Sequence, residues 1–376
     1  MKSIAEKLIS FFGRNPGIIY LFAVVVWALT LAAKLLYNGL IFGFDYGLFH
    51  PDGALYSFRA LLWSGQSESE AGRLVGEWYR SNSFNAQYQG PELYYRNNAF
   101  LWDQYSGRIL YPLLSVPFVK LFGVGGMLVV PAATMLFVLL VTSRIALNLK
   151  VPAIGYLAII LISLSTSIQR WMFANITDGL LLLFVSIFAW LVQRRSNLNL
   201  TKSDHVILAI AVIGSSLTRF SALIWISVAL VFLVHKKFFT SVLVGGLALL
   251  GLAPIFLKPF SGHVLPGYSD KSLIEKIFIY PINLVKVTVF ELGQLYVLDR
   301  TFFVFLLFCI CLAVVYRHHN SSKFFLAVLI AVWLTGAING VLGVNFRYQL
   351  PVVPLLLWAF VETFPKFLSR VRNYSD

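Results

Sequence analysis

The stretch HPDGALYSFRAL, residues 50–61, decides how the rest of this chain is interpreted. It follows the first long apolar run, residues 17–40, and lies near the start of a mostly polar loop, residues 43–123, in an otherwise apolar sequence. The loop carries Asp52 and, just upstream, Asp45, so both acids lie near the predicted end of a membrane-spanning helix. Carboxylates are rare close to a bilayer unless they serve a function. The pattern therefore predicts an active site at the membrane surface, on the side away from the cytoplasm.

The composition is that of a polytopic membrane protein. Hydrophobic residues make up 59% of the chain, charged residues 12%, and the mean hydropathy is +0.78. A soluble domain carries about twice this share of charge. The net charge of +14 comes from Lys and Arg spread in small groups between apolar runs, without the basic face that tracks a nucleic-acid backbone. We therefore expect an all-helical integral membrane protein, one domain over residues 1–376, whose partners include membrane lipids and no nucleic acid.

About ten apolar runs are long enough to cross a bilayer, or nearly so. Several are shorter than the about 20 residues of a full span, so their ends must include flanking polar residues. The predicted spans lie near residues 17–40, 124–143, 151–168, 178–193, 205–218, 221–234, 240–257, 302–316, 324–343 and 350–364.

The positions of Lys and Arg predict the orientation of these spans. With a cytoplasmic N-terminus, the inner segments hold fifteen basic residues, whereas the short outer turns hold Arg170, Arg219 and Arg347 alone. Basic residues accumulate in cytoplasmic loops. Both termini are therefore predicted to be cytoplasmic, and the short chain with small loops favours a bacterial plasma membrane.

Two apolar segments are interpreted as helices at the outer interface. Residues 109–122 are short and contain two prolines, and residues 277–298 carry polar side chains at spacings of three to five. If either segment alone spanned the bilayer, many basic turns would move outside, so an amphipathic or re-entrant placement is preferred. The second outer loop then covers residues 258–301.

Three arginines lie at predicted outer helix ends, namely Arg108, Arg219 and Arg347. The planar guanidinium suits two-point binding of phosphate, although each of these side chains alone is also explained by snorkelling to lipid headgroups. Asp178 begins a predicted span, where it or Thr177 forms an N-cap, or where Asp178 holds an acceptor or a metal. Asp52 is likewise explained by a turn or a helix N-cap, because Pro-Asp-Gly favours turns.

These features together resemble the GT-C superfamily, polytopic glycosyltransferases that use polyprenyl-phosphate-linked sugars. His50-Pro51-Asp52 is similar to the HPDE motif of its lumenal mannosyltransferases, with Gly53 in place of the glutamate. The stretch from Arg108 to Pro112 resembles the surface helix that leads into their second span. Asp178 before a leucine run, and Arg347 before the prolines of the last apolar helix, complete the resemblance. The likeness covers nearly the whole chain, although its motifs are short.

The resemblance implies transfer of a sugar to an acceptor hydroxyl of a glycan, lipid or protein, with inversion, in the cell envelope. Asp52, with Asp45 as the second candidate, would be the general base. The substrate- and phosphate-binding residues would be His50, Asp103, Arg108, Asp178, Arg219 and Arg347, with Arg347 first. Asp103 or Asp45 would bind a divalent cation or orient the acceptor, and the sequence leaves both roles open.

Two other classes of function use the same residues differently. A transporter or flippase of a lipid-linked or anionic solute needs the arginines but not Asp52 as a base. Transporters place their polar groups near the bilayer midplane and are built from repeats, neither of which the sequence shows. An assembly factor without catalysis would tolerate substitution of Asp52.

Overall fold

The computed structural model describes residues 15–36, 51–82, 107–149, 152–174, 176–219, 221–251, 273–339 and 347–375. This part of the chain is helical throughout and contains no strand, as the sequence predicted. Three stretches are long and apolar enough to cross a membrane: Ile18–Leu36, Leu110–Asn148 and Leu350–Val371. Several shorter apolar helices accompany them. The all-helical fold is therefore confirmed, with three stretches that could span a membrane in the described part, while the number of ten spans stays a prediction.

The structure describes eighteen helical elements along the chain. In order, they are α2 (Ile18–Leu36), α3 (Pro51–Trp63), α4 (Glu68–Asn82), α7 (Leu110–Phe122), η1 (Gly123–Leu128), α8 (Val129–Asn148), α9 (Pro152–Leu164), α10 (Thr166–Met172), α11 (Asp178–Gln193), η2 (Ser196–Leu198), α12 (Lys202–Thr218), α13 (Ala222–Val234), α14 (Phe238–Leu250), α16 (Leu273–Leu298), α17 (Arg300–Val315), α18 (Asn320–Asn339), η3 (Leu350–Val352) and α19 (Val353–Ser375).

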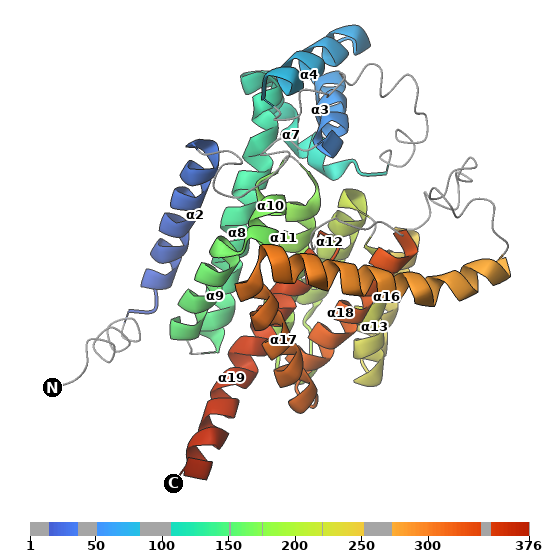
Figure 1. Ribbon diagram of the computed structural model, residues 1–376. Helices are drawn as coiled ribbons and strands as arrows, with labels where there is room; N and C mark the ends of the chain where they lie inside the picture. Colours follow the sequence, from blue (N-terminus) through green and yellow to red (C-terminus); the bar gives the residue numbers. More distant parts are fainter. Residues whose placement is uncertain are drawn as a thin grey trace.

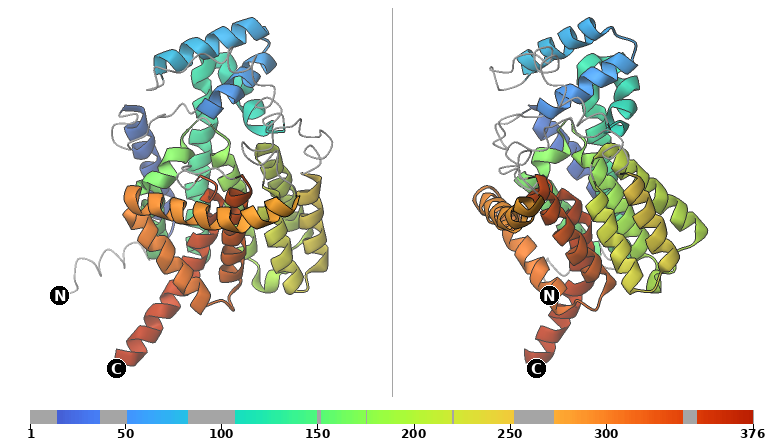
Figure 2. Two further views of the ribbon diagram at one scale, coloured as in Figure 1. Left: turned by 45° about the vertical axis from the view of Figure 1, so that its right-hand side comes forward. Right: turned by 90° about the vertical axis from the view of Figure 1, so that its right-hand side faces the viewer.

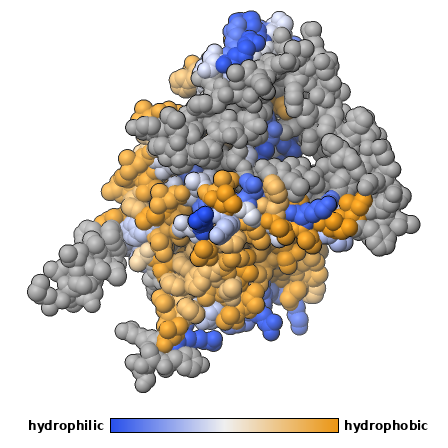
Figure 3. Space-filling view, in the orientation of Figure 1, coloured by the Kyte–Doolittle hydropathy of each residue, from blue (hydrophilic) through white to orange (hydrophobic). Residues whose placement is uncertain are grey.

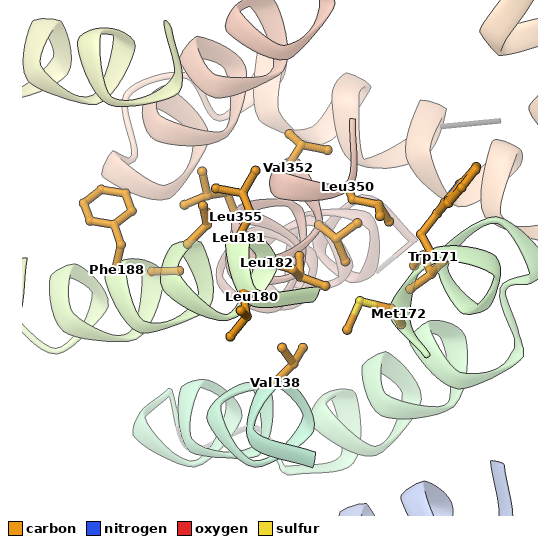
Figure 4. Packing of buried hydrophobic residues seen from close by; sticks show 14 of the residues in the cluster. Val138, Trp171, Met172, Leu180, Leu181, Leu182, Phe188, Leu350, Val352 and Leu355 are labelled. Carbon is orange, nitrogen blue, oxygen red and sulfur yellow. The ribbon is translucent and has the colours of Figure 1, made fainter. Parts of the chain in front are cut away.

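Helix α11 lies at the centre of the bundle. After its first residue its sequence is apolar on all sides, which is typical of a helix surrounded by others. It packs against α8, α12 and α19, and Figure 4 shows Leu180 facing Val138 of α8. Toward its other end, Phe188 makes edge-to-face contacts with Trp225 of α13 and Phe324 of α18. The outer surface is broadly apolar, with hydrophilic residues over α4 and along the opposite edge (Figure 3).

The two ends of the bundle differ in their charged residues. Helices α11 and α13 begin at one end, where α12 finishes at Arg219. At the other end α11 is followed by Arg194 and Arg195, both of which pair with Asp204 of α12. The start of α2 and the end of α19 also lie at this second end (Figure 1). We call the first the Asp178 end and the second the basic end.

Helices α3, α4 and α7 form a cap beyond the Asp178 end (Figures 1 and 2). The rings of Tyr56 in α3 and Tyr111 in α7 meet edge to face at 5.4 Å. The apolar stretch that begins with α7 is broken at Gly123, whose φ of 61° suits glycine. The chain then folds back, and the Tyr111 hydroxyl donates to the carbonyl oxygen of Met127 at 2.8 Å. The predicted separation of residues 109–122 from the following span is thus observed, while their place at the interface stays a prediction.

Helix α16 runs across the bundle instead of along it (Figures 1 and 2). Its polar stripe faces partly inward, because Glu291 is buried, whereas Val285, Val289 and Val297 are exposed. An exposed apolar face on a transverse helix is typical of helices that lie in a membrane interface. Lys286 of the same polar stripe is exposed, so the amphipathic or re-entrant placement of residues 277–298 stays a prediction.

The fold-back at Gly123 generates the first testable prediction. A Cβ atom at Gly126 would lie 2.2 Å from the backbone oxygen of Phe118, whereas one at Gly246 in α14 would meet nothing within 4 Å. We expect Gly126→Ala to cost about 1–3 kcal/mol, because backbone cannot move aside as a flexible side chain does. Thermal unfolding in detergent should show a lower midpoint for this variant and an unchanged or higher one for Gly246→Ala. Equal midpoints for Gly126→Ala and the wild type would contradict the fold-back.

Candidate functional site

Asp178 is the centre of a buried ionic cluster that joins three helix ends. Its Oδ1 accepts a hydrogen bond from Arg219 Nη1, at the end of α12. Its Oδ2 accepts from Arg347 Nε at 3.1 Å, and Arg347 lies in the turn just before η3. Residues 41 and 169 positions away in the sequence therefore meet on one carboxylate. Asp178 fixes how the ends of α11, α12 and η3 lie relative to one another.

The predicted N-cap at the start of α11 is confirmed in position but not in its hydrogen bond. Thr177 occupies the N-cap position with helical backbone angles, and its side chain makes no capping hydrogen bond. Asp178 is the first residue of the helix and uses its carboxylate for the two arginines. A carboxylate at a helix N-terminus also benefits from the helix dipole. The sequence located the acid and left open whether it caps the helix or holds a ligand, and it did not predict the two ion pairs.

Arg219 and Arg347 are buried, which excludes snorkelling to lipid headgroups for these two side chains in the structure. Their exposed fractions are 5% and 7%, and that of Asp178 is 2%. Each guanidinium also lies over an aromatic ring, Arg219 over Tyr348 at 4.4 Å and Arg347 over Trp171 at 5.0 Å. Buried arginines need such partners because the transfer of an unpaired charge out of water is very costly.

Asp52 joins the cluster from the cap. Its Oδ2 accepts a hydrogen bond from Arg347 Nη1 at 2.7 Å, so one guanidinium bridges Asp52 and Asp178. The predicted turn at Pro51-Asp52-Gly53 is instead the first turn of α3, with Pro51 in the first helical position that proline favours. The Asp52 side chain is 25% exposed, in contrast to Asp178. It is therefore the more accessible of the two acids.

Arg108 brings a third guanidinium to this end of the bundle. Its Nη1 donates to the hydroxyl of Tyr56 in α3 at 3.2 Å, and both residues lie within electrostatic reach of Arg219. Three arginines against Asp52 and Asp178 give these five residues a formal charge of +1.

Several buried polar atoms beside the cluster make no hydrogen bond within the described part of the chain. They are the Thr177 hydroxyl, the Ser221 hydroxyl and both side-chain amide atoms of Gln349. Each belongs to a residue one or two positions from a charged member of the cluster. Buried polar groups nearly always have partners. Similar atoms occur elsewhere in the bundle, for example the hydroxyls of Ser321 and Ser322, so these atoms alone do not identify a ligand site.

The structure brings together five of the eight residues singled out from the sequence: Asp52, Arg108, Asp178, Arg219 and Arg347. His50, Asp45 and Asp103 lie outside the described residues. Within the described part, no group of three or more His, Cys, Asp or Glu residues could hold a metal ion. The predicted roles of Asp45 and Asp103 toward a divalent cation therefore stay predictions.

Two residues that support the cluster, Lys34 and Trp171, were not identified from the sequence. Lys34 is buried near the end of α2, and its Nζ donates to the carbonyl oxygen of Gln169 in α10 at 2.6 Å. Trp171 lies two residues after Gln169, and the Arg347 guanidinium packs over its ring. The sequence did offer a signal for the Lys34 contact, because a lysine inside an apolar run is conspicuous. It offered none for the contact of Trp171 with Arg347, because the sequence does not show which helix ends are neighbours.

The different burial of the two acids generates a prediction about stability. Asp178→Asn leaves two buried guanidiniums without their carboxylate, so we expect a loss of about 3–5 kcal/mol. Asp52→Asn should cost about 1–2 kcal/mol, because Asp52 is partly exposed and Arg347 keeps Asp178. The unfolding midpoints of the two purified variants in detergent would show which substitution costs more stability. A larger loss for Asp52→Asn would show that Asp178 is not the centre of the cluster.

Comparisons with known proteins add no assignment to this geometry. No protein-family model matches the sequence, and neither the curated proteins nor the solved structures gave a significant match. The functional interpretation therefore depends on the residues of the cluster and on their surroundings.

Proposed function

We propose that this protein is a membrane glycosyltransferase of the GT-C type, which moves a sugar from a polyprenyl-phosphate donor to an acceptor hydroxyl. The observation that carries the proposal is Arg347, which bridges the partly exposed Asp52 and the buried Asp178. Arg347 thereby places a cation for the donor phosphate directly beside Asp52, the carboxylate that would act as base for the acceptor. The reaction needs both groups side by side, because bond formation and departure of the phosphate occur at the same carbon.

The proposed reaction is a single displacement. The acceptor oxygen forms a bond to the anomeric carbon while the bond from that carbon to the phosphate oxygen breaks. The acceptor proton passes to Asp52, and the electron pair of the broken bond leaves with polyprenyl phosphate. The anomeric configuration is inverted, as in other single displacements at this carbon. A phosphate leaves readily, so the mechanism requires a base but no general acid.

Asp52 fits the role of base better than Asp178 does. Asp178 is nearly inaccessible and is held by two arginines, so it cannot meet an acceptor without disruption of three helix ends. Asp52 lies on the cap, is 25% exposed, and is oriented by a 2.7 Å hydrogen bond from Arg347. That bond orients the carboxylate and leaves it within reach of solvent. Asp178 is in this proposal a positioning residue.

Arg347 and Arg219 would stabilise the negative charge that develops on the departing phosphate. They are fixed before the reaction by Asp178 and by the rings of Trp171 and Tyr348. Groups that are already oriented cost no reorganisation when charge develops, which makes such stabilisation effective. Arg108 would add a third positive charge, which gives the five residues of the cluster a formal charge of +1.

The location of the cluster favours a transferase over a transporter. The charged residues lie at the end of the bundle beneath the cap, whereas transporters bind solutes near the bilayer midplane. The opposite end carries the basic residues that mark cytoplasmic loops. By this rule the cluster would face the extracytoplasmic side of a bacterial plasma membrane, where lipid-linked sugars meet acceptors of the cell envelope.

The decisive variant is Asp52→Asn, which keeps an oxygen for Arg347 but cannot take a proton. With purified protein in nanodiscs and a panel of polyprenyl-phosphate sugars, we expect release of polyprenyl phosphate to fall at least about 100-fold. Donor binding should be retained. Glu70→Gln is the matched control, because Glu70 is a carboxylate of the same cap that pairs with Arg73 on the surface. Equal rates for Asp52→Asn and wild type would remove Asp52 as the base, and absence of donor binding by either protein would favour the transporter.

A second variant tests the phosphate-binding role of Arg347. Arg347→Lys keeps the charge but loses the planar fork that holds Asp52 and Asp178 together. We expect weaker donor binding and at least about ten-fold slower turnover, with a folded protein by thermal unfolding. Lys286→Arg, on the exposed side of α16, provides the control for conservative exchange of a cation. Unchanged kinetics for Arg347→Lys would show that the fork is dispensable.

A further inference from the structure

An apolar groove runs between α13 and α18, away from the ionic cluster. It has a volume of about 480 Å³. Its walls are formed by one face of each helix, with Leu223, Leu230 and Val234 on α13 and Ala327 and Leu334 on α18. These residues recur at intervals of three, four or seven positions, which place them on a single side of each helix.

The length of the groove fits a lipid chain better than a protein helix. Leu223 and Val234 are eleven residues apart on α13, which corresponds to about 16 Å. This is close to half of the about 30 Å thickness of the bilayer hydrocarbon. One chain of a phospholipid occupies a single leaflet, whereas a transmembrane helix of a partner needs an apolar face across the whole thickness.

A lysine closes the groove at the basic end. Lys323, in the first turn of α18, lines the groove beside the end of α13. Its Nζ lies 3.1 Å from Nε2 of His235, the residue that follows α13. Burial lowers the pKa of His235, and Lys323 and Lys237 lower it further. The imidazole is therefore neutral at pH 7 and accepts one ammonium proton, so two protons of Lys323 are available to a ligand.

The charge at this mouth is positive and lacks a carboxylate. Within the described residues, no Asp or Glu pairs with Lys323, and Lys236 is exposed immediately after His235. The N-terminal turn of the 20-residue helix α18 adds the positive end of its dipole. An apolar groove that ends in a cationic mouth is complementary to a molecule with an acyl chain and an anionic headgroup.

We propose that the α13/α18 groove binds an anionic phospholipid. One acyl chain lies between α13 and α18, and the phosphate accepts hydrogen bonds from Lys323 at the basic end. Helix α13 begins three residues after Arg219 and ends beside Lys323, so the phosphate site and the ionic cluster are at opposite ends of this helix. The lipid site is thus independent of the proposed glycosyl transfer.

The test uses the full-length protein in a neutral detergent and native mass spectrometry with phosphatidylglycerol or phosphatidylcholine added. We expect the wild type to retain phosphatidylglycerol about five-fold more strongly, which is the contribution of one basic residue at a membrane surface. Lys323→Gln should remove this preference and Lys323→Arg should keep it. Lys286→Gln, on α16, is the matched control and should behave as the wild type.

A second variant tests the groove itself. Ala327→Phe fills it without a change of charge, and we expect both lipids to bind at least about five-fold more weakly. Equal retention of the two lipids by the wild type would overturn the proposal, as would binding unaffected by both Lys323→Gln and Ala327→Phe. A dimer in the same spectra that disappears with Ala327→Phe would assign the groove to a second copy of the chain. Because the wild-type comparison needs no variant, a misfolded Lys323→Gln would not decide the outcome.

Discussion

The arrangement of the bundle depends on one buried carboxylate that pairs with two buried guanidiniums. Asp178, Arg219 and Arg347 come from α11, the end of α12 and the turn before η3. None of these charges is stable alone in an apolar interior, so each arginine needs the carboxylate and the carboxylate needs the arginines. The ion pairs therefore fix the relative heights of the helix ends.

The same cluster explains why the cap lies where it does. Arg347 has donors on more than one edge, so after Asp178 is bound it still donates to Asp52 at the start of α3. Within the cap, the hydrogen bond from Arg108 to Tyr56 and the ring contact of Tyr56 with Tyr111 hold α3 against α7. A buried acid that is held tightly and a second acid that stays partly exposed thus share one arginine. The difference in exposure between Asp178 and Asp52 gives the first a structural role and the second a chemical one in the proposed reaction, although both are aspartates.

Much of this arrangement could be predicted from the sequence. In a chain with 12% charged residues, a charge at the end of an apolar run is conspicuous, and this signal located Asp52, Asp178, Arg219 and Arg347. The roles of individual residues were less accessible. The ion pairs of Asp178 were not predicted, because local patterns describe neighbours in sequence, whereas its partners are 41 and 169 residues away. Lys34, Trp171 and the α13/α18 groove were missed because they depend on which helices are adjacent.

The two proposals place different lipid chemistry at the two ends of one helix. At the start of α13, buried arginines are already balanced by carboxylates, so a phosphate there must compete with, or bind beside, existing ion pairs. At its other end, Lys323 interacts with a neutral histidine and has no carboxylate partner in the described part, so a phosphate there displaces nothing. Arginines that are already paired with carboxylates suit a substrate that must leave after each reaction, since tight binding of the product would slow turnover. A lysine without a carboxylate partner in the described part, beside an apolar groove, suits a lipid that stays bound. The pairing of the cations with carboxylates, more than the presence of cations, distinguishes the two sites.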